Sequence, residues 1–332
     1  MLDLDLEGLL TEVKALNPAP KTMVVQFPDG LKINLREVVE RLEEATHAEV
    51  ISVLDPCFGA CDLADDKAKK YAADLLIHFG HSKLYHAAVK TLYWPLHYRV
   101  SEEAIWKIAG KLKALKVKTV SLNAASQYVK DLDRLSKALE REGIHAEQGK
   151  TKSALERGQV LGCDLSNPRT VEGAVDAHLF YGDGLFHALG LLFASKKPCY
   201  QFNPLLMEWV DLNQYHDKFL RRRYALIGKA QEAKTFGILM SSKVGQFRKK
   251  IAVEAKKLIE KHGKKAFLFS LDNVNPNALM GLGIDCWVNT ACPRIATDDA
   301  GLYKEPMITH EELKVALGEK KFEEYVFDEI RH

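Results

Sequence analysis

The chain has 332 residues, and its 47 Lys and Arg nearly balance its 45 Asp and Glu, giving a formal net charge of +2. This balance excludes a strong overall field for nucleic acid or anionic membranes, and 47% hydrophobic with 28% charged residues is typical of globular rather than disordered chains. The start of the chain is acidic and amphipathic, and no apolar run approaches the roughly 18 to 20 residues of a membrane span, so we expect a cytoplasmic protein that contacts neither membrane nor nucleic acid directly.

Short apolar runs alternate with longer stretches of helical periodicity, a pattern typical of β-α-β units with a buried parallel sheet. Strands are predicted, in chain order, at residues 22–27, 49–54, 74–79, 118–123, 158–163, 177–182, 198–203, 235–240, 266–271 and 286–291. Between them, helical periodicity predicts helices at residues 35–45, 101–115 and 246–263. The predicted class is therefore α/β.

The order of strands and helices restarts three times, near Lys21, Val117 and Thr235. Two of these copies share a similar stretch, FGHSKLYHA at 79–87 and YGDGLFHALG at 181–190. A repeated unit of this kind predicts similar domains rather than one large sheet.

Pro95 and Pro204 interrupt regular structure between the predicted copies. We therefore predict three α/β domains at residues 1–102, 103–213 and 214–332, with no flexible linker between them.

Six cysteines, at positions 57, 61, 163, 199, 286 and 292, need an explanation other than disulfides, because cytosolic thiols are kept reduced. Cys61, Cys163 and Cys292 fall in or beside loops that follow predicted parallel strands, the edge where open α/β sheets bind ligands. Cys199 lies inside an apolar run, so we interpret it as a small buried hydrophobic residue.

If three similar domains face one another, one cysteine from each could hold a 4Fe-4S cluster and leave one iron open to a substrate. From the residues alone, three unconnected buried thiols remain an equally good interpretation. The close C-x2-C-x2-C spacing of ferredoxins is absent, and the pair Cys57 and Cys61 lacks the second pair that a structural zinc site needs.

Other candidate motifs are weaker. The stretch from Gly143 to Thr151 has five residues between its glycines where a phosphate loop has four. The histidines at 78, 81 and 86 could bind a metal, but packing or capping is the more common role of such residues. The basic stretches at 221–223 and 248–265 lie on amphipathic helical patterns and fit a solvated helix face.

A set of motifs in a fixed order resembles a known family. These are FPDGLK (27–32), FGACDLAD (58–65), FGHS (79–82), LGCDLSN (161–167), YGDGLFHALGL (181–191), SSKVGQ (241–246) and NTACPRIATDD (289–299). The family is the archaeal 3-amino-3-carboxypropyl transferase that begins diphthamide synthesis on elongation factor 2. The resemblance extends nearly from end to end of the chain.

The resemblance implies three Rossmann-like domains in a pseudo-threefold arrangement around a 4Fe-4S cluster, in a homodimer. It selects Cys61, Cys163 and Cys292 as the cluster ligands. It also implies that S-adenosylmethionine binds the open iron and that an electron from an external donor drives its cleavage. The 3-amino-3-carboxypropyl radical then adds to C2 of a histidine of elongation factor 2, leaving methylthioadenosine.

The matching loops supply the expected contacts to S-adenosylmethionine: Gly80, His81, Ser82, Asp183, Gly184, Ser241 and Gln246. Cys57 departs from the pattern, since the resemblance implies a small hydroxyl residue at this position; alternative ligation or oxidative lability could follow. The second functional hypothesis is a nonenzymatic iron-sulfur or scaffold subunit of a diphthamide synthase complex.

Overall fold

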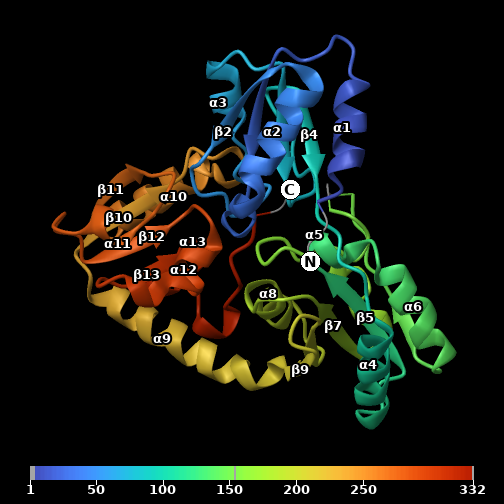
Figure 1. Cartoon of the computed structure of the whole chain (residues 1–332). Helices are drawn as coiled ribbons and strands as arrows, with labels where there is room; N and C mark the ends of the chain where they lie inside the picture. Colours follow the sequence, from blue (N-terminus) through green and yellow to red (C-terminus); the bar gives the residue numbers. More distant parts are fainter. Residues whose placement is uncertain (1–3, 153–154, 331–332) are drawn as a thin grey trace. The chain divides into compact units, whose positions relative to one another are not determined.

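The structure, a computed structural model, describes residues 4–152 and 155–330. In this part of the chain the strands form three sheets, each with helices on its faces (Figure 1). Every strand pair with a register is parallel except one. The predicted α/β class is confirmed, with three sheets that are mostly parallel.

The first sheet is assembled from residues near the N-terminus of the chain. Its strands are β1 (Thr22–Gln26), β2 (Glu49–Val53), β3 (Leu75–Phe79) and β4 (Thr91–Trp94), in the order β2-β1-β3-β4. Helices α1 (Leu6–Lys14) and α2 (Leu35–Thr46) pack on one face, and α3 (Asp65–Lys70) packs on the other. The central strands β1 and β3 are buried on both faces, which explains their continuous apolar sequences.

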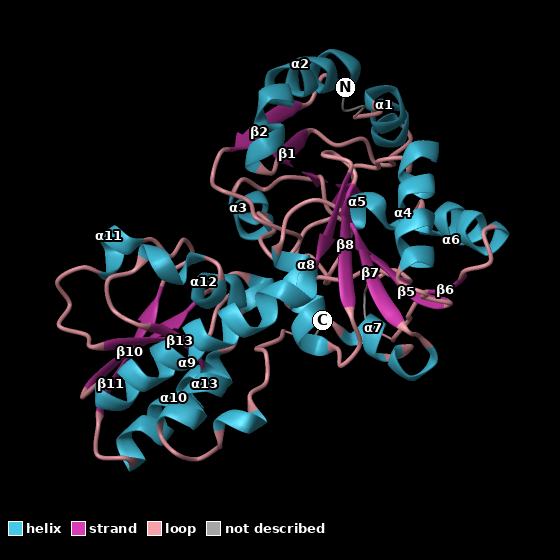
Figure 2. Ribbon diagram, turned by 90° about the horizontal axis from the view of Figure 1, so that it is seen from below, coloured by secondary structure: helices cyan, strands magenta, loops and turns pink. Residues whose placement is uncertain are grey.

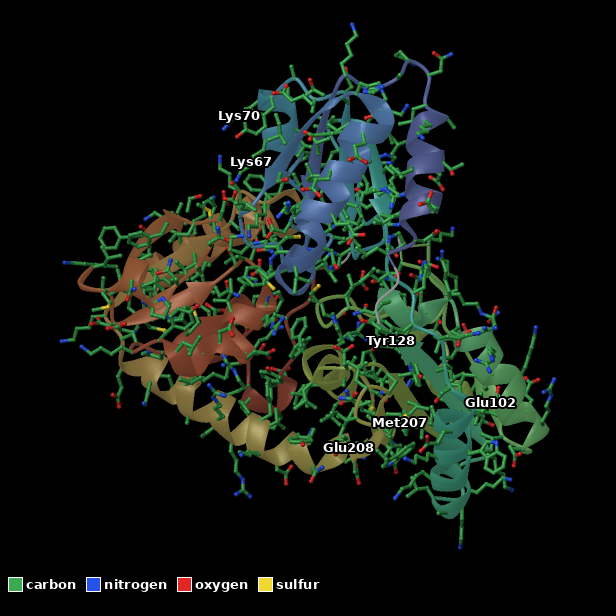
Figure 3. All side chains as sticks on the ribbon, viewed as in Figure 1. Lys67, Lys70, Glu102, Tyr128, Met207 and Glu208 are labelled. Carbon is green, nitrogen blue, oxygen red and sulfur yellow. The ribbon has the colours of Figure 1, made fainter. Side chains whose placement is uncertain are left out.

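The second sheet has the same order of its first four strands as the first sheet, and one additional strand. Its strands are β5 (Thr119–Ala124), β6 (His145–Glu147), β7 (Ala177–Tyr181), β8 (Cys199–Asn203) and β9 (Glu208–Asp211), in the order β6-β5-β7-β8-β9, and β9 is antiparallel to β8. Its helices are α4 (Glu102–Ala114), α5 (Ser126–Val129), α6 (Leu132–Arg141), α7 (Ser166–Arg169) and α8 (Phe186–Ala194). Ser101 caps α4, because its Oγ accepts a hydrogen bond from the Ala104 N–H at 3.1 Å. Tyr128 of α5 is labelled in Figure 3. Its ring packs edge-on against that of Tyr181 of β7, with ring centroids 5.4 Å apart.

The third sheet repeats the four-strand order. Its strands are β10 (Thr235–Met240), β11 (Lys265–Ser270), β12 (Cys286–Asn289) and β13 (Met307–Thr309), in the order β11-β10-β12-β13. Helices α9 (His216–Glu232), α10 (Lys249–Lys261) and α13 (His310–Ala316) share one core with this sheet, and α11 (Pro276–Leu279) and α12 (Pro293–Thr297) share another (Figure 2). The fully buried Arg223 joins α9 to α13, because its Nε donates to Glu312 Oε1 at 2.7 Å.

All three sheets begin in the same way. The residue before the third strand of each copy is an aspartate whose Oδ2 accepts hydrogen bonds from two successive backbone N–H groups at the start of the first strand. The sets are Asp74 with Lys21 and Thr22 at 2.7 and 3.1 Å, Asp176 with Lys118 and Thr119 at 2.9 and 2.9 Å, and Asp285 with Lys234 and Thr235 at 3.0 and 2.8 Å. The restarts near Lys21, Val117 and Thr235 are therefore copies of one structural unit.

One predicted strand is wrong, and four strands were not predicted. Residues 158–163 make only isolated bridges, Ala124 to Gln159 and Leu161 to Asp164. Gly158 has a φ of +73°, which is incompatible with an extended strand. The second strand of this repeat is β6 instead. Strands β6 and β13 have three residues each, and β4 and β9 have four, too short for a clear alternating pattern.

The chain divides into two compact units, Met1–Tyr98 with Lys243–Gly245, and Arg99–Ser242 with Gln246–His332. The three sheets lie inside the ranges predicted for the three domains, and the boundaries at 102 and 213 stay predictions. None of the helices in the described residues combines the length and the apolar character needed to cross a membrane.

Candidate functional site

Cys61 lies in the loop between β2 and α3, and the side chain of Gln26 at the end of β1 fixes the residues that follow it. Gln26 Nε2 donates to the Asp62 carbonyl at 2.7 Å, and its Oε1 accepts from the Ala64 N–H at 2.9 Å. Cys61 is half-buried. A strand end therefore supports the loop through a buried amide, as is typical of a site at the carboxyl edge of a parallel sheet.

A short segment from the third repeat completes this loop. The Gly245 N–H donates to the Cys61 carbonyl at 3.2 Å, and Lys243 Nζ lies 2.6 Å from Asp62 Oδ2. Lys243 also lies over the ring of Phe58, 5.6 Å from its centroid. A Cβ on residue 245 would come within 2.5 Å of both Cα and Cβ of Cys61, so only glycine allows this approach.

A chain of hydrogen bonds runs from Gln26 through His78 of β3 to His81, which follows this strand. Gln26 Oε1 accepts from His78 Nδ1 at 2.8 Å, which leaves His78 Nε2 to accept from His81 Nδ1 at 3.0 Å. The pKa of His78 is lowered to about 3 by burial and by His81, and burial lowers the pKa of His81 to about 4. Both rings are therefore neutral at neutral pH, and His81 Nε2 carries an accepting lone pair.

Cys57 approaches the same two histidines. One ligand atom each of Cys57, His78 and His81 lies within 4.8 Å of the others, and a thiol with two imidazoles is a donor set suited to zinc or ferrous iron. Burial and then Asp62 raise the pKa of the Cys57 thiol to about 12, so the thiol is protonated at neutral pH. In this state the two histidines are hydrogen-bonded to each other, and the Cys57 thiol lies near them and faces the carbonyls of Gly59 and Asp62.

Cys163 lies in a tight turn and not at the end of a strand, which corrects the sequence interpretation. The Gly162 N–H donates to Nδ1 of His187 in α8 at 2.7 Å. A Cβ on Gly162 would lie 2.5 Å from the Phe186 ring, so this turn packs directly on the first residues of α8. The Cys163 carbonyl accepts a hydrogen bond from the Ile330 N–H at 2.7 Å.

Cys292 follows β12 and is the N-cap residue of α12, whose first residue is Pro293. Asn289, the last residue of β12, holds the loop from both sides: its Nδ2 donates to the Cys292 carbonyl at 2.8 Å and its Oδ1 accepts from the Ala291 N–H at 3.1 Å. Cys163 and Cys292 thus both lie in loops of the second unit that hydrogen bonds hold in place.

The six cysteines divide by environment. Cys61, Cys163 and Cys292 are half-buried, whereas Cys57, Cys199 and Cys286 are buried. Burial raises the pKa of Cys199 to about 12 and raises that of Cys286 well above its ordinary value. Because the thiolate is the metal-binding form, the half-buried set fits an iron-sulfur cluster better than the buried set does.

The residues expected to contact S-adenosylmethionine lie in loops after the strands β3, β7 and β10. Gly80, with a φ of +84°, and the half-buried His81 and Ser82 follow β3. Gly184, with a φ of +71°, and the half-buried Asp183 follow β7. Gln201 Nε2 donates to the carbonyls of Gly182 and Gly184 at 2.9 and 2.8 Å, which fixes this second loop.

Ser241 and Gln246 follow β10, and both are buried. Ser241 Oγ lies 3.5 Å from Asp272 Oδ1. The sequence interpretation missed Lys243 and Arg248 nearby, although SSKVGQ was recognised as a motif. Nothing in the sequence signals their partners, because Asp62 and Asp328 are 181 and 80 positions away.

The comparisons with known proteins agree with one another. The family model for diphthamide synthesis proteins matches residues 27–326. The 2-(3-amino-3-carboxypropyl)histidine synthase of Pyrococcus horikoshii is 37% identical over 97% of this chain and 92% of its own, and that of Methanocaldococcus jannaschii is 30% identical over 100% and 94%. The crystal structure of Dph2 from Pyrococcus horikoshii with a 4Fe-4S cluster is similar, with a TM-score of 0.89 and 34% identity over 100% of this chain and 95% of that one. The chain therefore belongs to the diphthamide synthesis protein family.

Proposed function

We propose that this protein is an enzyme that transfers the 3-amino-3-carboxypropyl group of S-adenosylmethionine to C2 of a histidine of elongation factor 2, the first step of diphthamide synthesis. The observation that carries the proposal is the similarity over nearly the whole chain to two enzymes named 2-(3-amino-3-carboxypropyl)histidine synthase. The solved relative that contains a 4Fe-4S cluster supports the same cofactor here.

Cys61, Cys163 and Cys292 are the cluster ligands in this proposal. Their support is the motif resemblance together with their half-buried position in loops, in contrast to the three buried cysteines. When bound, a cluster with three protein ligands supplies an electron and one iron open to S-adenosylmethionine. The reaction proposed is radical cleavage that leaves methylthioadenosine.

The chain's own residues would bind and orient the substrate. S-adenosylmethionine carries a sulfonium, an ammonium and a carboxylate group. The Asp183 carboxylate suits one of the cationic groups, and the glycine turns at Gly80 and Gly184, both with positive φ, are proposed to let the backbone approach the substrate closely. His81, Ser82, Ser241 and Gln246 complete the proposed set of contacts. The proposal also includes a homodimer in the cytoplasm and an external electron donor.

The test is anaerobic reconstitution of the full chain with iron and sulfide. We expect about four irons per chain and, with reductant and S-adenosylmethionine, methylthioadenosine as the product. Each of Cys61→Ala, Cys163→Ala and Cys292→Ala is expected to lose most iron and all product, whereas Cys199→Ala, a change to a buried thiol, keeps both. Full iron and activity in all three ligand variants would overturn the ligand assignment, and 5'-deoxyadenosine as product would overturn the proposed bond cleavage.

A nonenzymatic subunit is the second candidate, because a relative in Caenorhabditis elegans, 29% identical over 90% of this chain, is named as subunit 1 of the synthase. Mass spectrometry of elongation factor 2 incubated with the reconstituted protein alone separates the two. A modified histidine without any added subunit excludes the scaffold function, and modification only after a second protein is added supports it.

A further inference from the structure

The last described residues, 327–330, contact the loops of two of the proposed cluster ligands. On the side of Cys163, the Ile330 N–H donates to the Cys163 carbonyl at 2.7 Å. Glu329 Oε2 accepts from the Leu165 N–H at 3.3 Å and from Arg169 Nη1 at 2.8 Å. The Glu329 side chain is only 8% exposed, so these bonds lie out of bulk water. The segment thus binds the Cys163 turn through both backbone and side chain.

On the side of Cys292, the contact runs through Arg248. Its Nη1 and Nη2 donate to Oδ1 and Oδ2 of Asp328, both at 2.8 Å, which is the two-point geometry of a strong guanidinium–carboxylate pair. Its Nε donates to the Thr290 carbonyl and its Nη2 to the Ala291 carbonyl, also at 2.8 Å each. These two carbonyls belong to the residues directly before Cys292.

All the donors of this guanidinium are used. A longer bond from Nη1 to the Glu329 carbonyl, at 3.4 Å, accounts for the remaining N–H, and the Arg248 side chain is 9% exposed. A guanidinium presents its five N–H groups in a rigid plane, so it fixes the distance between Asp328 and the Cys292 loop. A lysine has no such plane and could not bridge the same set of acceptors.

An aromatic contact holds the segment at its other end. The ring of the buried Phe327 stacks on Phe193 of α8 at 5.8 Å between centroids, and the ring of Phe219 of α9 lies 6.4 Å away. These helices belong to the second and third repeats respectively. The segment is therefore packed as well as hydrogen-bonded, and it joins the two repeats where their ligand cysteines lie.

We propose that residues 327–330 act as a strap that sets the positions of Cys163 and Cys292 for the cluster, with Arg248, Asp328 and Glu329 as positioning residues. This inference rests on the proposed ligand assignment. It extends that assignment by giving the C-terminal segment a part in cluster binding, although it contains no metal ligand. Residues that do not bind a metal themselves but orient its ligands contribute strongly to metal affinity. The strap orients the two cysteines through hydrogen bonds with the backbone carbonyls and N–H groups of their loops.

The variants that test the strap are conservative. Arg248→Lys keeps the charge and loses the planar donor set, and Asp328→Asn and Glu329→Gln keep size and lose the carboxylate. Arg134→Lys is the matched control, because Arg134 also contacts a carboxylate, Glu102, and a backbone carbonyl, that of Val100, on α6 away from the ligand loops. All are made in the full chain and reconstituted anaerobically.

The measurements are iron per chain, the rate of iron loss to a chelator, the electron paramagnetic resonance spectrum of the reduced cluster, and the unfolding midpoint of the cluster-free protein. We expect Arg248→Lys and Glu329→Gln to lose iron about 10-fold faster than the parent with an altered spectrum, while Arg134→Lys behaves as the parent. A cluster-free unfolding midpoint close to that of the parent shows that the loss is local.

Parent-like iron release and spectra in all three strap variants would overturn the strap, and so would equal loss in Arg134→Lys. If Arg248→Lys does not fold, the isosteric Glu329→Gln and Asp328→Asn decide by the same measurements. If the proposed function itself is wrong, the parent protein will bind no cluster under any condition. This result is distinct from a cluster that the parent keeps and the strap variants keep equally well.

Discussion

Cys57 and Cys61 lie four positions apart in one loop but have different surroundings. Cys57 is buried, and its thiol pKa is raised to about 12, whereas Cys61 is half-buried. Cys57 Sγ lies 3.8 Å from the carbonyls of Gly59 and Asp62, a typical distance for a weak thiol donor inside a loop. The spacing that resembles half of a metal motif therefore reflects one packing cysteine and one proposed ligand.

At the residue scale we predict that Cys57→Ser keeps the cluster. Serine is smaller and can donate to the same carbonyls, so the loop should keep its shape, with a loss of stability of about 1 kcal/mol. Iron content and the spectrum of the reduced cluster measure the outcome. A protein without cluster would make Cys57 a ligand, and loss of both iron and fold, seen by circular dichroism, would instead make it a structural residue of the loop.

The site could be predicted from the sequence only in part. Cys61, Cys163 and Cys292 were selected because they lie in the motifs FGACDLAD, LGCDLSN and NTACPRIATDD, which carry the resemblance to the family. Lys243 and Arg248 were missed, since an ion pair with a residue far along the chain leaves no local pattern. Only their contacts in the folded structure, Lys243 with Asp62 and Arg248 with Asp328, show that they support the ligand loops.

At the scale of elements, loops carry the site and strands support them. Gln26, Asn289 and Gln201 lie at or near strand ends, and each fixes a loop by donating to its carbonyls. The strands and helices that support these loops were predicted where their patterns are long, as for α4 and α10. The short strands β6 and β13 were missed because three residues carry no periodicity, so the tertiary pairing with a neighbouring strand decides their conformation.

The segment 243–245 gives a prediction at this scale. In Gly245→Ala the new methyl group would lie within 2.5 Å of Cys61 Cα and Cβ, so either the segment or the Cys61 loop must move. We expect a loss of stability of about 1 to 3 kcal/mol and reduced iron occupancy, measured by chemical unfolding and by iron analysis.

Gly110→Ala is the control for this substitution. Gly110 lies inside α4, and nothing lies within 4 Å of the position of its Cβ, so alanine should raise stability by up to about 1 kcal/mol and leave iron unchanged. Unchanged iron and stability in Gly245→Ala would show that the Cys61 loop tolerates displacement by the segment.

At the scale of the whole molecule, the three copies of the aspartate at the start of each sheet offer a test of the repeat. Two backbone hydrogen bonds lower the pKa of Asp74 and of Asp176. A carboxylate with a lowered pKa stabilises the fold above its unfolded pKa, and this contribution is lost as the pH falls through the folded pKa; at neutral pH it is fully present.

We therefore predict that Asp74→Ala, Asp176→Ala and Asp285→Ala each lower the thermal unfolding midpoint at pH 7. The Asn variants should be milder, because the amide oxygen can still accept a hydrogen bond from the backbone. Differential scanning calorimetry measures the six variants. Equal effects of Ala and Asn at every position would show that the acceptor is unimportant, and an effect at one position alone would show that the three copies are not equivalent.

The repeat itself was predictable, since the spacing of buried strands and the similar stretches at 79–87 and 181–190 are visible in the sequence. The division into units was not. Three residues of the third repeat belong to the first unit, because Gly245 packs against Cys61 and Lys243 pairs with Asp62.

This arrangement has a consequence for the order in which the protein matures during synthesis. The first unit is contiguous up to Tyr98, and a ribosome that has released those residues has already supplied all four strands of its sheet. Its cysteine loop nevertheless lacks Lys243 and Gly245 until translation passes residue 245, long after early domains usually fold. A nascent chain that carries only the first sheet therefore holds Cys61 in an unfinished loop, which favours iron loading after translation is complete.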